Sequence, residues 1–239
     1  MNKLSLTILW MYPDLMSTYG DRGNIIVLTK RSQWRGIVVN IIENGIEKAD
    51  LIFMGGAQDR QQKIVSRDLF SKKGEILRQK IEEGVPGLFI CGAYQFLGHY
   101  YLPAEGDKIP GLSIFDAYTR HYGLQKPRAI GNIVIDWNGK KLVGFENHGG
   151  RTYLGKKVRP FGLVLKGYGN NGEDKTEGAV YKNAYGTYLH GPILPKNPEF
   201  ADFLIQKALE VKYKKEIKLK SLDNSLEQQA KKSILQKIV

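Results

Sequence analysis

The sequence predicts a single α/β domain with a mostly parallel central sheet flanked by helices. In roughly the first hundred residues, apolar runs alternate with helix-like segments, which is the order of elements in a βαβ sheet. The runs are apolar at successive positions, as in strands that are buried on both faces. The chain has 239 residues, of which 42% are hydrophobic, so it is long enough to bury one sizeable core.

The first half of the chain supplies the strands of this sheet. Four apolar runs are expected to form them: SLTILW (5–10), IVVNII (37–42), DLIFMGG (50–56) and VPGLFI (85–90). Between them we expect helices over 22–34 and 61–83. The second helix is expected to carry one apolar side, formed by Ile64, Leu69, Ile76, Leu77 and Ile81. It should end at Gly84 and Pro86, because both residues interrupt helices.

The second half of the chain has shorter strand-like pieces separated by Gly, Asn and Pro. These pieces are 130–137, 141–147, 161–167 and 178–190, and some of them are expected to be antiparallel. A last helix is expected with Asn197 as N-cap and Pro198 in its first turn. The sequence therefore predicts one domain over 1–210 and a Lys-rich helical tail over 211–239.

The charge and composition favour a cytoplasmic protein. Of the net charge of +12, the tail supplies +5 from eight Lys and three acidic residues. Elsewhere no basic stripe is interleaved with aromatic residues, so specific nucleic-acid binding is not expected. A lone Cys fits a reducing compartment, and no apolar run approaches the roughly 18 residues of a membrane span. The tail is open to three interpretations: an inert solvated helix, a docking element or a contact to anionic lipid.

The lone cysteine, Cys91, follows the apolar strand 85–90 and precedes a segment that can begin a helix. A nucleophile at such a strand-to-helix elbow projects from the carboxyl edge of the sheet, where open α/β sheets place their sites. Gly92 and Ala93 supply little side-chain bulk, so a substrate carbonyl can come close. The alternative is that Cys91 is simply a small buried hydrophobic residue.

His190 is the histidine best placed to act as the base for Cys91. It ends another apolar run and is followed by Gly191, so it is expected at the same sheet edge. His148, in a predicted loop, is the second choice. His99 is expected within the helix after Cys91, and His121 in a connector. The alternative is that His190 has no catalytic role.

A third strand end points to the same site. Gly55 and Gly56 follow the strand over 50–56, and their amides, with that of Gly92, are expected to form an oxyanion hole. Gly-Gly after a strand is a weak signal alone. Gly-Gly, Cys and His at three strand ends in sequence order are a much stronger one.

At these residues the chain resembles the class I glutamine amidotransferases of the cobyric-acid-synthase-like (CobB/CobQ) branch. The segment FICGAYQFLG (89–98) is similar to the nucleophile motif of that branch, with Phe89 and Ala93 in place of two of its glycines. Within the branch the chain looks most like the GatD-type glutaminase subunits of lipid II isoglutaminyl synthase. Four further segments carry this resemblance: YPDLMSTYGDRGN (12–24), MGGAQDRQQ (54–62), FENHGGRTYLG (145–155) and YGTYLHGP (185–192).

The resemblance implies hydrolysis of L-glutamine through a glutamyl thioester on Cys91, with His190 as base. It implies Arg128 as the residue that holds the glutamine carboxylate, with Tyr94, Gln95 and His148 as further substrate-binding residues. A guanidinium fork suits a carboxylate. The ammonia would pass to a Mur-ligase-like (MurT-type) partner subunit in a heterodimer, which would amidate the D-glutamate α-carboxyl of lipid II. ATP and Mg²⁺ would belong to that partner, and this chain would need no cofactor or metal.

The chain departs from many class I amidotransferases after the histidine. They carry an acid two residues beyond it, where this chain has Pro192. A Cys–His dyad can suffice, because a thiolate needs less assistance than a hydroxyl. Alternatively, the partner subunit supplies the acid.

Two rival functions stay open: the same glutaminase chemistry serving another synthetase, such as one that amidates cobyrinate, and a catalytically silent scaffold subunit.

The segment 150–157 is similar to a phosphate-binding loop, but it ends in Lys instead of Ser or Thr and Pro160 follows closely. ATP binding by this chain is therefore not expected.

Overall fold

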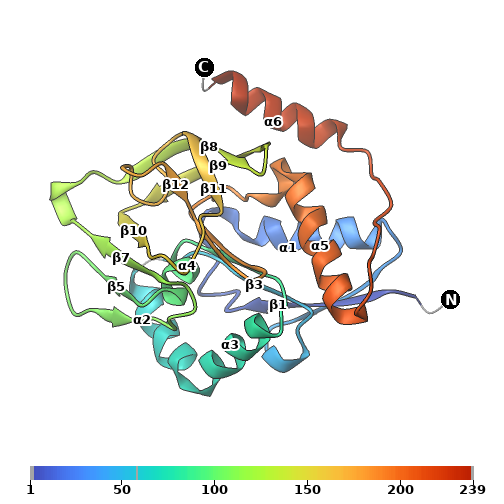
Figure 1. Ribbon diagram of the computed structural model, residues 1–239, viewed down its shortest axis with the longest axis horizontal. Coiled ribbons are helices and arrows are strands. Elements are labelled where there is room, and N and C mark those ends of the chain that lie inside the picture. The colour runs from blue at the N-terminus through green and yellow to red at the C-terminus, as the bar shows by residue number, and fades with distance from the viewer. Residues whose placement is uncertain (1–2, 58, 238–239) are drawn as a thin grey trace.

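The main sheet is parallel over most of its width. The structure, a computed structural model, describes residues 3–57 and 59–237. The strands of this sheet, sheet A, lie in the order β13-β14-β4-β3-β1-β2, and each neighbouring pair is parallel except β13–β14. Figure 1 labels β1 and β3 of this sheet, which lie between the helices. The strands are β1 (Ser5–Met11), β2 (Val38–Ile42), β3 (Leu51–Met54), β4 (Gly87–Ile90), β13 (Ala179–Tyr181) and β14 (Ala184–Thr187).

The four strands expected in the first half of the chain are confirmed, with two differences. β2 is the edge strand, so Val38 and Ile41 are 48% and 43% exposed, and the strand is not buried on both faces. β3 ends at Met54, which leaves Gly55 and Gly56 in the loop that follows it.

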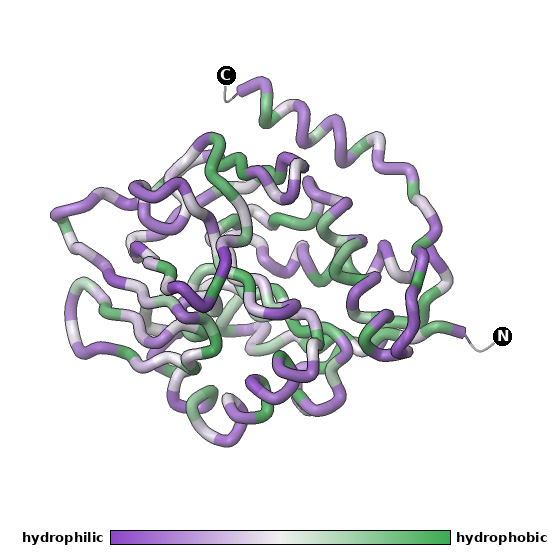
Figure 2. Tube along the Cα trace, in the orientation of Figure 1, coloured by the Kyte–Doolittle hydropathy of each residue, from purple (hydrophilic) through white to green (hydrophobic). Residues whose placement is uncertain are grey.

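Helices cover both faces of sheet A. On one face lie α1 (Arg22–Gln33) and α5 (Pro198–Tyr213), and on the other lie α2 (Asp59–Asp68), α3 (Gly74–Glu82) and the short α4 (Gly92–Leu97). Each face has its own core of buried apolar side chains. Figure 2 shows the hydrophobic segments gathered along the strands and α5, whereas the outer turns are hydrophilic.

The predicted helix over 61–83 is broken in the middle. A π-helical turn, η3 (Leu69–Lys73), separates α2 from α3, and Ser71 leaves helical geometry with a ψ of −161°. The break changes which side chains face the core: Leu69, Leu77 and Ile81 are buried, but Ile64 is 54% exposed. The prediction that Ile64 shares the apolar side was therefore wrong.

Two smaller sheets follow in the second half of the chain. Sheet B has the order β10-β7-β5-β6 and sheet C the order β12-β11-β8-β9. Their strands are β5 (Tyr100–Leu102), β6 (Ile109–Pro110), β7 (Ala117–His121), β8 (Ala129–Trp137), β9 (Lys140–His148), β10 (Gly150–Leu154), β11 (Gly162–Lys166) and β12 (Thr176–Glu177). β8, β9 and β11 match predicted strands, and 178–190 contains the hairpin of β13 and β14. Residues 150–154, in the segment similar to a phosphate loop, form strand β10.

Single turns of 3₁₀-helix connect several elements. They are η1 (Thr18–Gly20), η2 (Ile46–Lys48), η4 (Gly123–Gln125) and η5 (Leu194–Lys196). Asn197 directly precedes α5, as predicted for its N-cap. However, its side chain accepts a hydrogen bond from the Val143 amide and donates to the carbonyl oxygens of Val143 and Ile193, instead of capping the helix.

The C-terminal tail ends in a helix, α6 (Ser225–Lys237), which lies against the domain. Arg31 of α1 is 2% exposed and donates hydrogen bonds to Asp202 of α5, to Asn224 and to Glu227 of α6. Lys231 of α6 pairs with Glu199.

In the described part of the chain, every helix is too short or too polar to cross a membrane.

Candidate active site

Cys91 lies at a sharp elbow between β4 and α4. Its backbone has φ 51° and ψ −104°, a conformation that non-glycine residues rarely adopt. The Cys91 amide donates a hydrogen bond of 2.8 Å to the carbonyl oxygen of Thr187, at the end of β14, which fixes the elbow to the neighbouring strand. Strain of this kind persists only where the surroundings impose it, and it is the geometry of a nucleophile elbow. The predicted strand–turn–helix elbow is thus present.

His190 follows β14 and lies beside Cys91. Its amide and carbonyl exchange hydrogen bonds with Phe145 of β9, which holds the backbone in place. The side chain is fully buried. Burial would lower the pKa of His190, but the neighbouring Cys91 sulfur and the Asp21 carboxylate outweigh burial and raise the pKa to about 10. Together these groups favour the imidazolium form of His190.

Asp21 is a site residue that the sequence analysis missed. Its Oδ1 lies 3.5 Å from Nδ1 of His190, and both side chains are fully buried. Its Oδ2 accepts a hydrogen bond of 2.7 Å from the Gly56 amide. Asp21 follows β1 and η1. The chain therefore has an acid beside His190, but this acid comes from the loop after β1 and not from the position two residues beyond the histidine. The sequence did contain a signal for Asp21, because it is an acid in the loop after β1, a strand of the same sheet as β4 and β14.

The two glycines after β3 make room for this acid and for the histidine. A Cβ atom on Gly56 would lie 2.7 Å from Cε1 of His190, and one on Gly55 would lie 2.3 Å from the carbonyl oxygen of Met16. The Gly56 amide is already bonded to Asp21. We therefore revise the expectation that Gly56 donates to an oxyanion. The neighbouring Ala57 lines the cavity, and its amide nitrogen lies 3.4 Å from where a Cβ on Gly92 would be.

A cavity of about 560 Å³ opens in front of Cys91. Arg128 lies at its rim and is exposed; its Nε and Nη2 donate to the Asn147 side-chain oxygen. Gln95 also lines the cavity, and its amide group bonds to Tyr188 and Gln62. The expectation that Arg128 and Gln95 share one site with Cys91 is consistent with this geometry.

His148 also lines the cavity, buried and stacked on Tyr188 with ring centroids 3.7 Å apart. Its Nδ1 lies 2.7 Å from the carbonyl oxygen of Gly150, so Nδ1 carries the proton and donates. Burial lowers the pKa of His148, so the ring is neutral near pH 7. The neutral ring of His148 can contact substrate. No contact among the described residues places its Nε2 lone pair against Cys91.

Tyr94 does not lie in the cavity wall. It is 1% exposed, and its hydroxyl donates to the side chain of Asn170 in the core. It faces away because successive residues of an α-helix are about 100° apart around its axis, so Tyr94 faces the core where Gln95 faces the cavity. His99 lies beyond the end of α4, not within it as expected, and pairs with Asp116 on the surface. His121 lies on β7 and lines the cavity.

These groups can carry out acyl transfer at a thiol. A nucleophile at an elbow, an imidazolium beside it and a buried carboxylate behind it form the arrangement of a cysteine hydrolase. Among the described residues, no cluster of three His, Cys, Asp or Glu side chains is arranged to hold a metal ion. A second cavity, of about 590 Å³, lies between the loop after β1 and the α2–α3 segment, away from Cys91 and His190.

Comparison with known proteins identifies the family of this site. Residues 7–198 match the CobB/CobQ-like glutamine amidotransferase domain. The chain belongs to the CobB/CobQ-like glutamine amidotransferases. The matched range contains Asp21, Cys91 and His190, so the whole site lies within the family domain.

Two relatives match this amidotransferase along nearly their whole length. One is the GatD subunit of lipid II isoglutaminyl synthase (glutamine-hydrolyzing) from Staphylococcus aureus (strain N315), 46% identical over 96% of this chain and 95% of the relative. The other is the GatD subunit from Streptococcus pneumoniae (strain ATCC BAA-255 / R6), 40% identical over 94% of this chain and 88% of the relative. A solved glutamine amidotransferase superposes with a TM-score of 0.59 at 13% identity, over 84% of this chain and 98% of its own, which shows the shared fold.

Proposed function

We propose that this chain is the glutaminase subunit of a two-protein amidating enzyme and hydrolyses L-glutamine through a thioester on Cys91. The observation that carries this proposal is the strained elbow of Cys91 beside the buried His190–Asp21 pair, at a cavity of about 560 Å³. A cavity of this size accommodates an amino acid. Membership of a glutamine amidotransferase family supplies the substrate.

The first half-reaction makes the thioester. The Cys91 sulfur attacks the side-chain amide carbon of glutamine, and its electron pair forms the C–S bond while the carbonyl oxygen takes up negative charge. The amides of Gly92 and Ala57 are our proposed donors to that oxygen, because both lie beside Cys91. His190, as the imidazolium, protonates the departing nitrogen, so ammonia leaves and a glutamyl thioester remains.

The second half-reaction uses the same histidine in the opposite direction. Neutral His190 now accepts a proton from water, whose oxygen attacks the thioester carbon; the C–S bond breaks, and glutamate and the thiolate are released. Asp21 holds Nδ1 of His190 and stabilises the imidazolium each time it forms. Tyr19 meets the ring of His190 edge to face, with ring centroids 5.1 Å apart, and we propose that it limits access of bulk water.

Arg128 is our proposed anchor for the glutamine α-carboxylate. Two of its nitrogens are bonded to Asn147, which aims the guanidinium at the cavity rim and leaves Nη1 for the substrate. Gln95 and His148 line the same cavity and are proposed as further substrate contacts.

The partner and the acceptor come from the relatives. Since both GatD relatives are subunits of lipid II isoglutaminyl synthase, we propose that this chain passes ammonia to a Mur-ligase-like (MurT-type) subunit that binds ATP and Mg²⁺. That subunit would amidate the D-glutamate α-carboxyl of lipid II in cell-wall synthesis. Matches over 96% and 94% of this chain favour this acceptor over cobyrinate.

The test is release of glutamate from glutamine by the purified chain, with and without the synthetase subunit. Wild type is compared with Cys91→Ser, which removes the only thiol, and with His190→Gln. His99→Gln is the matched control, since His99 lies on the surface, paired with Asp116. We expect both site variants to lose at least 10³-fold in kcat, and the control to keep it.

A glutamine-analogue electrophile adds a second readout, because a single label on the wild type reports on Cys91 alone. Absence of glutamate release and of labelling in the wild-type complex would exclude the glutaminase and leave the scaffold function. Glutamate release without amidation of lipid II would instead point to a different synthetase.

A further inference from the structure

The outer face of sheet B carries two arginines directly opposite each other. In the antiparallel pair of β10 and β7, Arg151 is in register with Arg120. Residues in register point to the same face, with their Cβ atoms about 5 Å apart, and like charges at such a position repel. Two residues along each strand, Tyr153 faces Tyr118 in the same way. We call Tyr100, Tyr118, Arg120, Arg151 and Tyr153 the arginine–tyrosine face.

No carboxylate of the described residues pairs with either arginine. Arg151 is 4% exposed, and its Nε and Nη1 have no hydrogen-bond partner within residues 3–57 and 59–237. Its Nη2 donates to the carbonyl oxygen of Pro127. Arg120 is exposed and lies 4.9 Å from the ring of Tyr122, whereas nearby Lys126 is paired with Glu173. Arg151 also lies 5.9 Å from the ring of Tyr168, so the chain itself covers this guanidinium. Its unpaired charge adds to that of the exposed Arg120, which is the cation that an external anion can reach.

The tyrosines of the face form a ladder. Ring centroids of Tyr100 and Tyr118 are 5.4 Å apart, and those of Tyr118 and Tyr153 are 5.3 Å apart, with the rings nearly parallel in both pairs. Because the rings stack on one another, they present edges and hydroxyl groups to solvent, and Tyr118 is 38% exposed. Exposed tyrosine edges and hydroxyl groups beside an arginine suit a protein surface, where Tyr and Arg dominate binding energy.

The same strands line the catalytic cavity with their other face. Thr119 and Thr152, which alternate with the residues of the arginine–tyrosine face, point inward and are bonded to each other at 2.7 Å. Thr152 continues to Tyr188, which bonds to Gln95 in the cavity wall. His121 and Gly150, at the ends of these strands, line the cavity directly. One thin sheet therefore separates the outer face from the substrate.

We propose that the arginine–tyrosine face docks an acidic surface of the synthetase subunit. The inference rests on the proposed function, which supplies that partner. A partner carboxylate would pair with Arg120 and offset the charge of Arg151, while the tyrosine edges pack and donate hydrogen bonds. Docking here places the synthetase one sheet away from the cavity in which ammonia forms.

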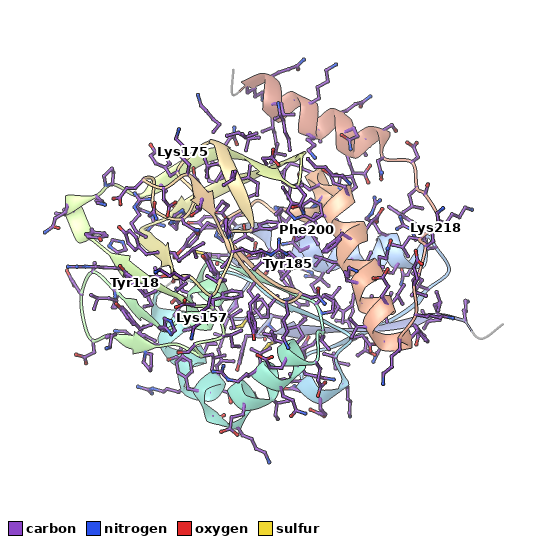
Figure 3. The ribbon with its side chains drawn as sticks, in the orientation of Figure 1. Tyr118, Lys157, Lys175, Tyr185, Phe200 and Lys218 are labelled. Carbon is purple, nitrogen blue, oxygen red and sulfur yellow. The ribbon has the colours of Figure 1, made fainter. Side chains whose placement is uncertain are left out.

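The test measures the dissociation constant between this chain and the purified synthetase subunit. Arg120→Glu reverses the charge on the face, and Tyr118→Ala shortens the ladder without changing charge. Lys218→Glu makes the same charge change on the opposite side of the molecule, as Figure 3 shows for Tyr118 and Lys218. We expect Arg120→Glu to weaken binding about tenfold or more, with Tyr118→Ala weakening it less, and Lys218→Glu to change it less than about twofold.

Glutamate release is measured on the same samples at saturating synthetase subunit, where we expect Arg120→Glu to retain the wild-type kcat. Unchanged affinity in both Arg120→Glu and Tyr118→Ala, with a complex that still releases glutamate, would overturn the docking surface and leave the glutaminase intact. Absence of any wild-type complex would overturn the docking surface and the proposed two-protein enzyme, whereas glutamate release by the chain alone would still support the glutaminase. Arg120-dependent binding to vesicles of anionic lipid, with synthetase binding unaffected, would overturn the proposal in favour of a lipid contact.

Discussion

Asp21 stands directly before α1, where a carboxylate ordinarily caps the helix. In this chain it makes no side-chain cap; it bonds to the Gly56 amide and faces His190. The local sequence favours a helix cap, but the tertiary structure places Asp21 in the active site, because the loop after β1 folds back over the end of β3. Membership of the active site is therefore a consequence of strand order, which a single segment of sequence does not specify.

We expect Asp21→Asn to lower kcat for glutamine hydrolysis by about 10²-fold. The Asn oxygen can still accept from the Gly56 amide, so the loop is kept, but the charge that stabilises the His190 imidazolium is lost. The check is steady-state glutamate release by the complex, with circular dichroism to confirm folding. Asp14→Asn, an exposed acid in the same loop, is the control. An unchanged kcat in Asp21→Asn would favour a dyad or an acid from the partner.

At the residue scale, the sequence predicted Cys91 and His190 because each follows an apolar strand of one parallel sheet. It could not assign the glycines correctly. Whether Gly56 donates to a substrate or to Asp21 depends on a loop that lies 35 residues earlier in the chain. Tyr94 was misplaced for a similar reason: the resemblance identifies the segment, but the turn of α4 decides which side chains reach the cavity.

Among the elements, the apolar strands of the central sheet were predictable, and the two-residue or polar strands were not. β1, β3 and β4 are runs of apolar residues buried on the central sheet. By contrast, β6 and β12 have two residues each, too few to show a period. β7 does alternate, but with Tyr and Arg outside, so it does not stand out from a polar connector. The break between α2 and α3 has no Gly or Pro inside it, and periodicity alone misses it.

One short strand carries a buried carboxyl group. Glu177 of β12, in sheet C, is fully buried, and its Oε1 accepts hydrogen bonds from the Thr187 hydroxyl and the Tyr188 amide at the end of β14, in sheet A. Its Oε2 has no partner among the described residues. Burial raises the pKa of Glu177 to about 7, although the bonds from Thr187 and Tyr188 work against that shift. The contact between the two sheets therefore titrates near neutral pH.

Glu177→Gln should remove a pH dependence of stability. The folded-state pKa of about 7 exceeds the ordinary value of 4.5, so the folded protein binds more protons between these pH values. This group therefore contributes about 3 kcal/mol to the free energy of unfolding below pH 4.5, and that contribution is lost as the pH rises through 7. Urea denaturation measures the free energy of unfolding of both proteins from pH 4.5 to 8. The value for Glu177→Gln minus that for wild type should increase by this amount over that range. Glu75→Gln, an exposed control, should show no gain; a constant difference for Glu177→Gln would refute the assignment.

At the scale of the whole molecule, the sequence predicted one domain with a tail, and the structure adds how the tail is held. The tail was expected to lie on the surface because it is polar, and most of α6 is exposed. Polarity did not reveal that α6 contacts the domain through charged side chains. The buried Arg31 joins three segments, α1, α5 and the tail, through Asp202, Asn224 and Glu227.

Removing residues 221–239 should therefore destabilise the domain without affecting catalysis. Arg31 would keep Asp202 but lose Asn224 and Glu227, and Glu199 would lose Lys231. Since these groups are only partly exposed, we expect a loss of roughly 2 kcal/mol in the free energy of unfolding. No residue of α6 lines the cavity at Cys91, so kcat should stay at the wild-type value. Urea denaturation and glutamate release measure the two quantities.

A pair of point variants separates the ionic contacts from the loss of the helix itself. Lys231→Met removes the partner of Glu199, whereas Lys232→Met changes an exposed neighbour on the same helix. We expect Lys231→Met to be the less stable of the two by about 1 kcal/mol. Equal stability of the two would mean that α6 adds nothing through this contact. A truncated chain that keeps its stability but no longer binds the synthetase subunit would make the tail a docking element, because only a lost interface produces that combination.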